Sequence, residues 1–232
     1  MNVGLENSTP RRRLLWLLVP SLLFACTGCS LFVMAGKALL GDPKIAAEFR
    51  KTTGVDLTDG DDAVVIICSA PHRLQDRYPA LQIDIADRVS RNLETRNVKV
   101  VPSGDVAGWF DDHGEWGDYS ELAQKFDASF VIHIDVREFE HRVPQSENLM
   151  QGQAEGRISV HRYQRSEDGK RNEFEPAVTM AFDRDFRLMF PGGYPVPRET
   201  RSEDLFVEGF LDRVAQNIGH YFYDVRMSET IY

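Results

Sequence analysis

Hydrophobic positions alternate with polar ones in several segments, and this alternation predicts strands. Residues 63–68 (AVVIIC) form a continuous β-branched run bounded by turn residues, which is typical of a strand buried on both faces. In residues 129–141 the alternation is regular, so that Ile132, Ile134 and Val136 share one face of a long strand. Similar patterns predict further strands at residues 98–101, 156–165 and 177–190.

Apolar residues at helical spacing predict helices between and after these strands. Leu81, Ile85, Val89 and Leu93 lie four positions apart, which predicts an amphipathic helix over residues 79–96. Capping residues and apolar faces predict four more helices, at residues 43–54, 103–110, 118–126 and 202–223.

The order of these elements is β-α-β-α-α-β-β-β-α, which predicts an α/β (α+β) fold in a single domain. A right-handed βαβ unit would open the fold, and a β-meander and a C-terminal helix would close it. We expect a mixed sheet of about five strands, with the helices mostly on one face. The predicted domain covers residues 61–232, and residues 30–60 are interpreted as a tether with a short helix.

The first 29 residues have the pattern of an export signal. Three arginines, Arg11 to Arg13, precede an apolar stretch from Leu14 to Ala25, which is shorter than the roughly 20 residues of a membrane span. The stretch runs into ACTGCS, which resembles the lipobox of bacterial lipoproteins. This resemblance implies lipidation at Cys29, because small residues precede it, with Cys26 as the alternative.

An uncleaved membrane helix is the other interpretation of this leader. Apolar residues resume after Cys29, so that residues 14–36 would be long enough to span a bilayer. The arginines before this segment would then place the acidic domain outside, by the positive-inside rule. In both cases we expect an exported protein held at a bacterial membrane, either the outer membrane or the periplasmic face of the inner membrane.

Charge and cysteine content exclude several function classes. The net charge is −9, and residues 42–232 carry 23 basic and 35 acidic side chains, a net charge of −12. A domain with this much negative charge repels the phosphate backbones of nucleic acids, and we therefore expect no nucleic-acid partner. One cysteine, Cys68, lies outside the leader, so no disulfide framework is expected within the domain.

Two residues on the strand at 129–141 are candidates for chemistry. His133 and Asp135 share a face with Val131, Arg137 and Phe139 if the alternation continues. The pair would ligate a metal ion or act in acid–base catalysis. His161 would join them if a neighbouring strand is in register. We favour a partly solvated sheet face in which His133 is hydrogen-bonded to Asp135 or Arg137, because two ligands do not make a zinc site.

Two other clusters have both a chemical and a structural interpretation. The acidic residues of the 111–115 loop, with Asp118, have oxygen ligands for a divalent cation, but a solvated loop is favoured. Cys68 with His72 would make a nucleophile and base at a strand end, but a packed thiol is favoured. No nucleotide-binding, zinc-protease or paired CxxC motif occurs in the domain. We expect no enzyme activity and no cofactor.

Aromatic residues in predicted loops are candidates for a protein interface. Trp109, Phe110 and Trp116 flank the acidic loop, and Tyr194 lies in a Gly/Pro-rich loop. Aromatic side chains on loops often anchor interfaces. They pack equally well onto their own domain, and the sequence leaves these two alternatives open.

The element order and the segment LAQKFDASFVIHIDV resemble those of envelope-associated α/β domains. These domains include the curli-secretion lipoprotein, the TolB amino-terminal domain and the lipoprotein activators of penicillin-binding proteins. The segments GKALLGDPK and VDLTDGDDAVVIICSAP also resemble uncharacterised bacterial lipoproteins. The resemblance implies a domain that docks partners without chemistry.

The leading hypothesis is therefore a non-enzymatic, membrane-anchored envelope domain that binds or scaffolds another envelope protein. Two alternatives remain from the residues themselves. One is a metal-dependent hydrolase built on His133, Asp135 and His161. The other is a small-ligand-binding domain that uses the strand end at residues 69–72.

Overall fold

The computed structural model describes residues 43–60, 62–114, 118–164 and 177–229. Cys26, Cys29 and Trp116 lie outside the described residues. None of the helices in the described ranges is long and apolar enough to cross a membrane. One compact unit runs from Ala46 to Val225. The short strands β1 (Lys44–Ile45) and β7 (Val225–Arg226) form a separate two-stranded pairing.

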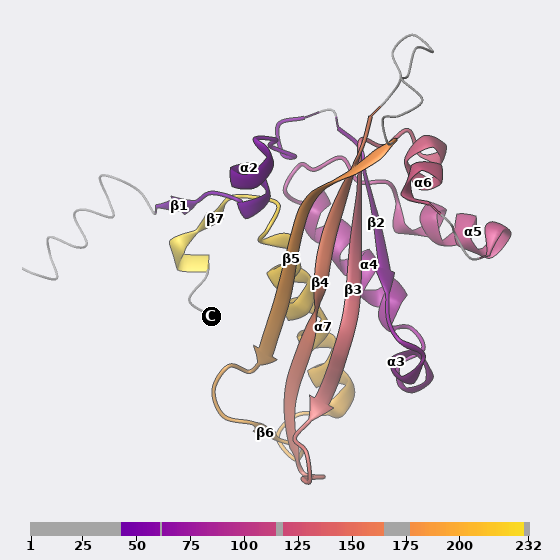
Figure 1. The fold of residues 1–232 in the computed structure, drawn as a ribbon. Helices are drawn as coiled ribbons and strands as arrows, with labels where there is room; N and C mark the ends of the chain where they lie inside the picture. The colour runs from indigo at the N-terminus through magenta and orange to yellow at the C-terminus, as the bar shows by residue number, and fades with distance from the viewer. Residues whose placement is uncertain (1–42, 61, 115–117, 165–176, 230–232) are drawn as a thin grey trace, which may run out of the picture. The chain divides into compact units, whose positions relative to one another are not determined.

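The compact unit is built on a mixed sheet of five strands (Figure 1). The strand order is β2-β3-β4-β5, and β6 pairs with β4. β2 is parallel to β3, and the other pairs are antiparallel, as expected for a meander. The predicted fold class is confirmed. The strands are β2 (Val64–Ser69), β3 (Phe130–Arg142), β4 (Leu149–Tyr163), β5 (Val178–Phe190) and β6 (Val196–Pro197).

Six helices accompany this sheet in the described ranges, and the longest two, α4 and α7, lie behind it in the view of Figure 1. The predicted start of the last helix at residue 202 is confirmed, since Ser202 caps α7 by accepting a hydrogen bond from the Leu205 amide at its Oγ. The helices are α2 (Glu48–Thr53), α3 (His72–Arg77), α4 (Leu81–Glu94), α5 (Ser103–His113), α6 (Tyr119–Lys125) and α7 (Glu203–Gly219).

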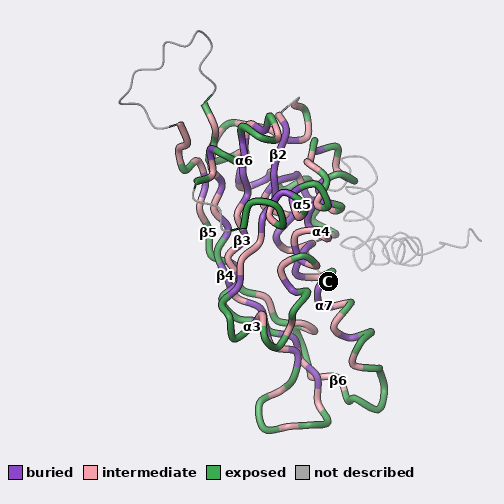
Figure 2. The backbone as a smooth tube through the Cα atoms, turned by 90° about the vertical axis from the view of Figure 1, so that its right-hand side faces the viewer, coloured by how far each residue is buried: buried purple, intermediate pink, exposed green. Residues whose placement is uncertain are grey.

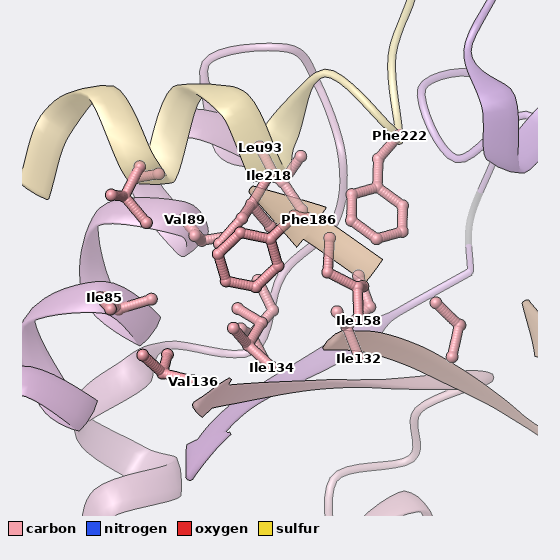
Figure 3. Close-up of a cluster of buried hydrophobic side chains, with 14 of the residues drawn as sticks. Ile85, Val89, Leu93, Ile132, Ile134, Val136, Ile158, Phe186, Ile218 and Phe222 are labelled. Atoms are coloured by element: carbon pink, nitrogen blue, oxygen red, sulfur yellow. The ribbon is translucent and has the colours of Figure 1, made fainter. Parts of the chain in front are cut away.

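The main hydrophobic core lies between the sheet and helices α4 and α7 (Figure 3). The four residues that predicted α4 are all at most 3% exposed, so the four-residue spacing identified the buried face correctly. They pack against Ile132, Ile134 and Val136, the predicted inner face of β3. Buried residues concentrate in this layer, whereas the loop around β6 is mostly exposed (Figure 2).

A smaller core covers part of the opposite face of the sheet. Helices α5 and α6 place Val106 and Leu122 against Val65 and Val131, which point away from α4. The helices thus lie on both faces, but α2, α3, α4 and α7 all contribute to the main core. The rest of the second face, along β4 and β5, is left open and carries charged side chains.

Helix α2 differs from the prediction in two ways. It starts at Glu48 instead of Pro43, because Lys44 and Ile45 are extended in β1. Its Phe49 is fully buried in the main core, as is Leu57 in the following turn. Residues 46–60 were expected in a tether, and they instead pack into the compact unit.

The second strand of the predicted βαβ unit is reduced to one bridge. Val100 pairs in parallel with Val64, and the backbone of Val64 bonds to Lys99 and Val101 at 2.9 Å on either side. Pro102 follows at once, and it has no amide hydrogen with which to continue a strand. The segment therefore turns directly into α5.

A β-bulge in β3 changes the predicted faces of this strand. The register with β4 shifts between Val136 and Glu138. Phe139 therefore lies on the core face, where its ring packs 4.8 Å from Phe210, and not beside His133 as the alternation predicted. An extra residue in one strand reverses the alternation after it.

Candidate functional site

A groove of about 560 Å³ lies at the C-terminal end of β2, between α4 and α5. Apolar residues of the two helices, among them Ala86, Ala107 and Phe110, line it together with two polar strand residues, Ser69 and His133. Ligand sites of α/β proteins often lie beyond the carboxyl ends of parallel strands. The groove is therefore the candidate site.

The sheet register brings the polar residues of this groove together. In the parallel pair of β2 and β3, Ser69 aligns with Asp135, and Ile67 aligns with His133. Ser69, His133 and Asp135 therefore all point to the face opposite α4, because side chains two apart share a face. Pro71 follows closely and ends β2, which leaves Ser69 at the strand end.

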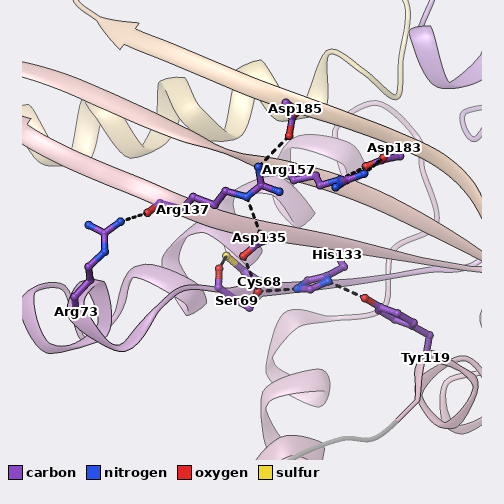
Figure 4. Close-up of polar contacts among 10 residues, drawn as sticks. All are labelled: Cys68, Ser69, Arg73, Tyr119, His133, Asp135, Arg137, Arg157, Asp183 and Asp185. Carbon is purple, nitrogen blue, oxygen red and sulfur yellow. Dashed lines mark hydrogen bonds and ion pairs between the residues drawn. The ribbon is translucent and has the colours of Figure 1, made fainter.

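His133 is held by hydrogen bonds at both ring nitrogens (Figure 4). Its Nε2 lies 2.7 Å from Ser69 Oγ, and its Nδ1 lies 2.9 Å from the hydroxyl of Tyr119 on α6. Burial lowers the pKa of His133 and raises the pKa of Tyr119. At neutral pH the imidazole is therefore uncharged and the phenol keeps its proton.

Asp135 belongs to a charged network on the open part of the sheet face (Figure 4). Its Oδ1 lies 3.5 Å from Ser69 Oγ, and its Oδ2 accepts from Arg137 Nε at 3.2 Å. Arg137 also donates to Asp185 at 3.2 Å, and a two-point ion pair joins Arg157 to Asp183 on β4 and β5. His133 is hydrogen-bonded on this face, as favoured from the sequence, but its partners are Ser69 and Tyr119 and not the predicted Asp135 or Arg137.

The arrangement of His161 does not support the metal-dependent alternative. The residue opposite His133 on β4 is Ser159, and His161 lies opposite Val131. The His161 ring stacks on Tyr119 with centroids 3.7 Å apart, and its Nε2 bonds to Ser159 Oγ at 3.2 Å. Within the described ranges, no group of three or more His, Cys, Asp or Glu residues is arranged to hold a metal ion.

The acidic segment after Phe110 is helical where the sequence predicted a loop. Helix α5 continues to His113, whose ring stacks on Trp109 with centroids 4.6 Å apart. The predicted helix end at residue 110 was therefore wrong. Asp118 instead caps α6, where its carboxylate accepts from the Ser120 amide at 3.1 Å, and hydrogen bonds from Ser120 lower its pKa. Glu115 lies outside the described residues.

Cys68 is a packed thiol, as favoured from the sequence. Its side chain packs against the main core, and burial raises its pKa, which disfavours a reactive thiolate. His72, the proposed base, is exposed at the start of α3. The next residue, Ser69, is the strand-end side chain that faces a histidine, His133.

Three of the four aromatic interface candidates lie in the described ranges, and their environments differ. Trp109 lies on α5 and is only 7% exposed, which agrees with the alternative in which it packs onto its own domain. Phe110 is half-buried against the same cluster and lines the groove. Tyr194 is 92% exposed. Among the three candidates that the structure describes, Tyr194 alone has the exposure that an aromatic anchor on a loop requires.

No protein-family model and no curated protein matches this chain. Solved structures match it with low scores. The PelC dodecamer from Paraburkholderia phytofirmans has 10% identity and a TM-score of 0.43, with coverage of 78% of this chain and 96% of PelC. The lipoprotein GNA1162 from Neisseria meningitidis has 12% identity and a TM-score of 0.37, with coverage of 67% and 99%.

A third match is the hypothetical protein CT253 from Chlamydia trachomatis, with 14% identity and a TM-score of 0.39, covering 70% of this chain and 98% of CT253. One of these three neighbours is described as a lipoprotein. Likenesses this weak concern general architecture, and no functional residue is transferred from them. The particular families that the sequence resembles stay a prediction.

Proposed function

We propose that this chain is an exported, membrane-anchored domain that binds a small, uncharged and largely apolar ligand in the groove at the end of β2. The observation that carries the proposal is the groove itself, in which apolar helix side chains surround the paired polar groups of Ser69 and His133. A mostly apolar cleft with a few convergent polar groups is the usual form of a small-molecule site.

The size and charge of the groove define the ligand class. Its volume of about 560 Å³ lies within the 300–1,000 Å³ typical of such sites. Among the described residues of the lining, Asp111 is acidic and His133 is uncharged because burial lowers its pKa. Asp111 and the net negative charge of the domain would both repel an anionic ligand, so a neutral ligand fits best.

A neutral fluorescent probe tests this site directly. N-phenyl-1-naphthylamine should bind the full-length protein, and Ala107→Trp, which fills the groove, should weaken binding at least about tenfold. Ala80→Trp is the matched control, because Ala80 is exposed and lies outside the groove lining. Equal binding by the two variants, or no binding by the unmodified protein, would contradict the groove as the ligand site.

The anchor rests on the leader pattern. Three arginines, a short apolar stretch and Cys29 after small residues support lipidation at that cysteine. The mature N-terminus, measured by mass spectrometry, should be an acylated Cys29. Cys29→Ser should prevent this modification, and Cys26→Ser should not. An unmodified initiator methionine in the membrane fraction would favour the uncleaved helix instead.

A protein partner is a second candidate, favoured by the exposure of Tyr194. The side-chain amide of Gln151 holds the backbone of this loop, since it donates to the carbonyls of Pro191 at 3.3 Å and Gly193 at 3.2 Å. A fixed, solvent-exposed aromatic side chain is suited to anchor another envelope protein. The test is photo-crosslinking in cells from position 194, with the 60%-exposed Met180 as control. An identical adduct pattern at both positions would refute the loop as an interface.

A further inference from the structure

We propose that Ser69 and His133 form a nucleophile–base pair that hydrolyses a neutral ester bound in the groove. The inference rests on the proposed groove site and adds a reaction to it. It goes beyond the Cys68–His72 and metal-centred alternatives, because it uses a serine that the sequence patterns did not single out as a nucleophile.

The distance between the two reacting groups suits proton transfer. Ser69 Oγ and His133 Nε2 are 2.7 Å apart, within the range expected of a nucleophile and its base. Both residues line the groove, so a bound substrate would reach the hydroxyl without displacing the core. Ser69 ends β2 and His133 lies in the part of β3 that pairs with β2, so the backbones of both residues are held by the sheet.

The second ring nitrogen of His133 is already oriented. Tyr119 OH lies 2.9 Å from Nδ1, which holds the ring in the plane that directs Nε2 at Ser69. When Nε2 is the acceptor, Nδ1 carries the proton and donates it to the Tyr119 oxygen. Tyr119 is therefore a positioning residue, with the role that a third group has in other serine nucleophiles.

Asp135 competes only weakly for the serine proton. Its Oδ1 lies 3.5 Å from Ser69 Oγ, which is longer than the contact to His133, and its other oxygen is bound to Arg137. Burial lowers the pKa of His133, so that the neutral imidazole is present at pH 7 to accept the proton. The short contact to the neutral base thus favours activation of the hydroxyl.

The reaction proceeds in two balanced steps. Ser69 Oγ attacks the ester carbonyl carbon while its proton passes to His133 Nε2, and the carbon–oxygen bond to the alcohol then breaks as the alcohol takes that proton. Water next attacks the acyl-serine while His133 accepts its proton, and the carboxylic acid leaves as Ser69 regains its hydrogen. No oxidant, metal or cofactor takes part in this sequence.

The lining also indicates how the substrate would be held. Ala86, Val106 and Phe110 would contact an apolar acyl chain. The substrate class is therefore a neutral ester with an apolar acyl group.

Labelling with an alkyl fluorophosphonate, followed by peptide mass spectrometry of the full-length protein, tests the proposal. The probe should modify Ser69, and Ser69→Ala should abolish the adduct. His133→Gln should slow labelling by about 10²- to 10⁴-fold. Ser146→Ala is the matched control and should leave the labelling of Ser69 unchanged, because Ser146 lies between β3 and β4, outside the groove lining.

The pH profile gives a second readout. Labelling should rise with pH through an apparent pKa below the usual 6.5 of histidine, and Tyr119→Phe should move that midpoint without abolishing labelling. Fluorophosphonate labelling of other serines in place of Ser69 would overturn the proposal. An unchanged rate of Ser69 labelling in His133→Gln would also overturn it. If N-phenyl-1-naphthylamine binding is retained while Ser69 stays unmodified, the catalytic inference alone fails and the proposed binding function stands.

Discussion

A cluster around Glu203 leads to a defined prediction about stability and pH. Glu203 opens α7, and its carboxylate lies 2.5 Å from His141 Nε2 and 2.6 Å from both Arg142 and Arg198. His141 is 7% exposed, and its other nitrogen lies 2.8 Å from the hydroxyl of Tyr78. The cluster thus joins the end of β3 to the start of α7. Glu203→Gln removes its negative charge and keeps its size.

The pKa of Glu203 sets the magnitude of the effect. Hydrogen bonds from His141 and then Arg142 lower it from 4.5 to about 2. A shift of that size corresponds to an upper limit of about 3 kcal/mol, at about 1.4 kcal/mol per pKa unit. Arg142 and Arg198 are 43% and 48% exposed, and solvent screening reduces the expected contribution to about 1–2 kcal/mol.

The direction of the pH dependence of stability follows from the direction of the pKa shift of Glu203. Because the pKa of Glu203 is lower in the folded state, its stabilisation is complete above the unfolded value of 4.5 and is lost as the pH falls toward about 2. Urea unfolding at pH 7 and pH 3 measures this. The stability difference between the protein and Glu203→Gln should narrow by about 1 kcal/mol on acidification.

Glu199→Gln is the control for this experiment, because it removes a carboxylate from an exposed position close by in the chain. Its stability difference from the unmodified protein should be small at both pH values, as is usual for surface charges. A Glu203→Gln difference that stays constant between pH 7 and pH 3 would show that the carboxylate does not titrate as this geometry requires.

Two further predictions concern the packing that supports the site. Gly156→Ala would place a Cβ 2.3 Å from the main-chain oxygen of Asp135, so we expect a loss of about 2–3 kcal/mol in urea unfolding. Gly108→Ala on α5, where an added Cβ meets nothing within 4 Å, should raise the free energy of unfolding by about 0.5–1 kcal/mol. A change of unfolding free energy in the same direction for both glycine variants would contradict this packing. Phe49→Ala should cost about 3–5 kcal/mol by the same assay, and a loss below about 1 kcal/mol would mean that α2 is not part of the core.

Elements with strong periodicity could be predicted from the sequence. The buried run of β2, the alternation of β3 and the four-residue spacing of α4 each specify one type of element and one buried face. The bulge after Val136 was missed because one unbroken alternation was assumed over residues 129–141, whereas the apolar positions change from even numbers up to Val136 to the odd-numbered Phe139. Phe139 was therefore assigned to the wrong face.

The candidate site was predictable only in part. Alternation placed His133 and Asp135 on one face, as the structure has them. It could not identify their neighbours, because Ser69 is 64 residues from His133 in the chain and meets it through the parallel pairing of β2 with β3. The sequence left Trp109 open between an interface and its own domain, because the pattern of α5 alone does not show that a second cluster with Val65 and Val131 covers this face of the sheet.

The central claim is that the groove at the end of β2 binds a small neutral ligand. A ligand titration followed by amide nuclear magnetic resonance tests this most directly. On addition of N-phenyl-1-naphthylamine to the full-length protein in detergent, the amide signals of Ser69, Ala107 and His133 should shift together with one dissociation constant. The signals of the exposed loop at Tyr194 should stay unchanged. Shifts confined to that loop, with the groove signals unmoved, would contradict the assignment of this groove as the binding site.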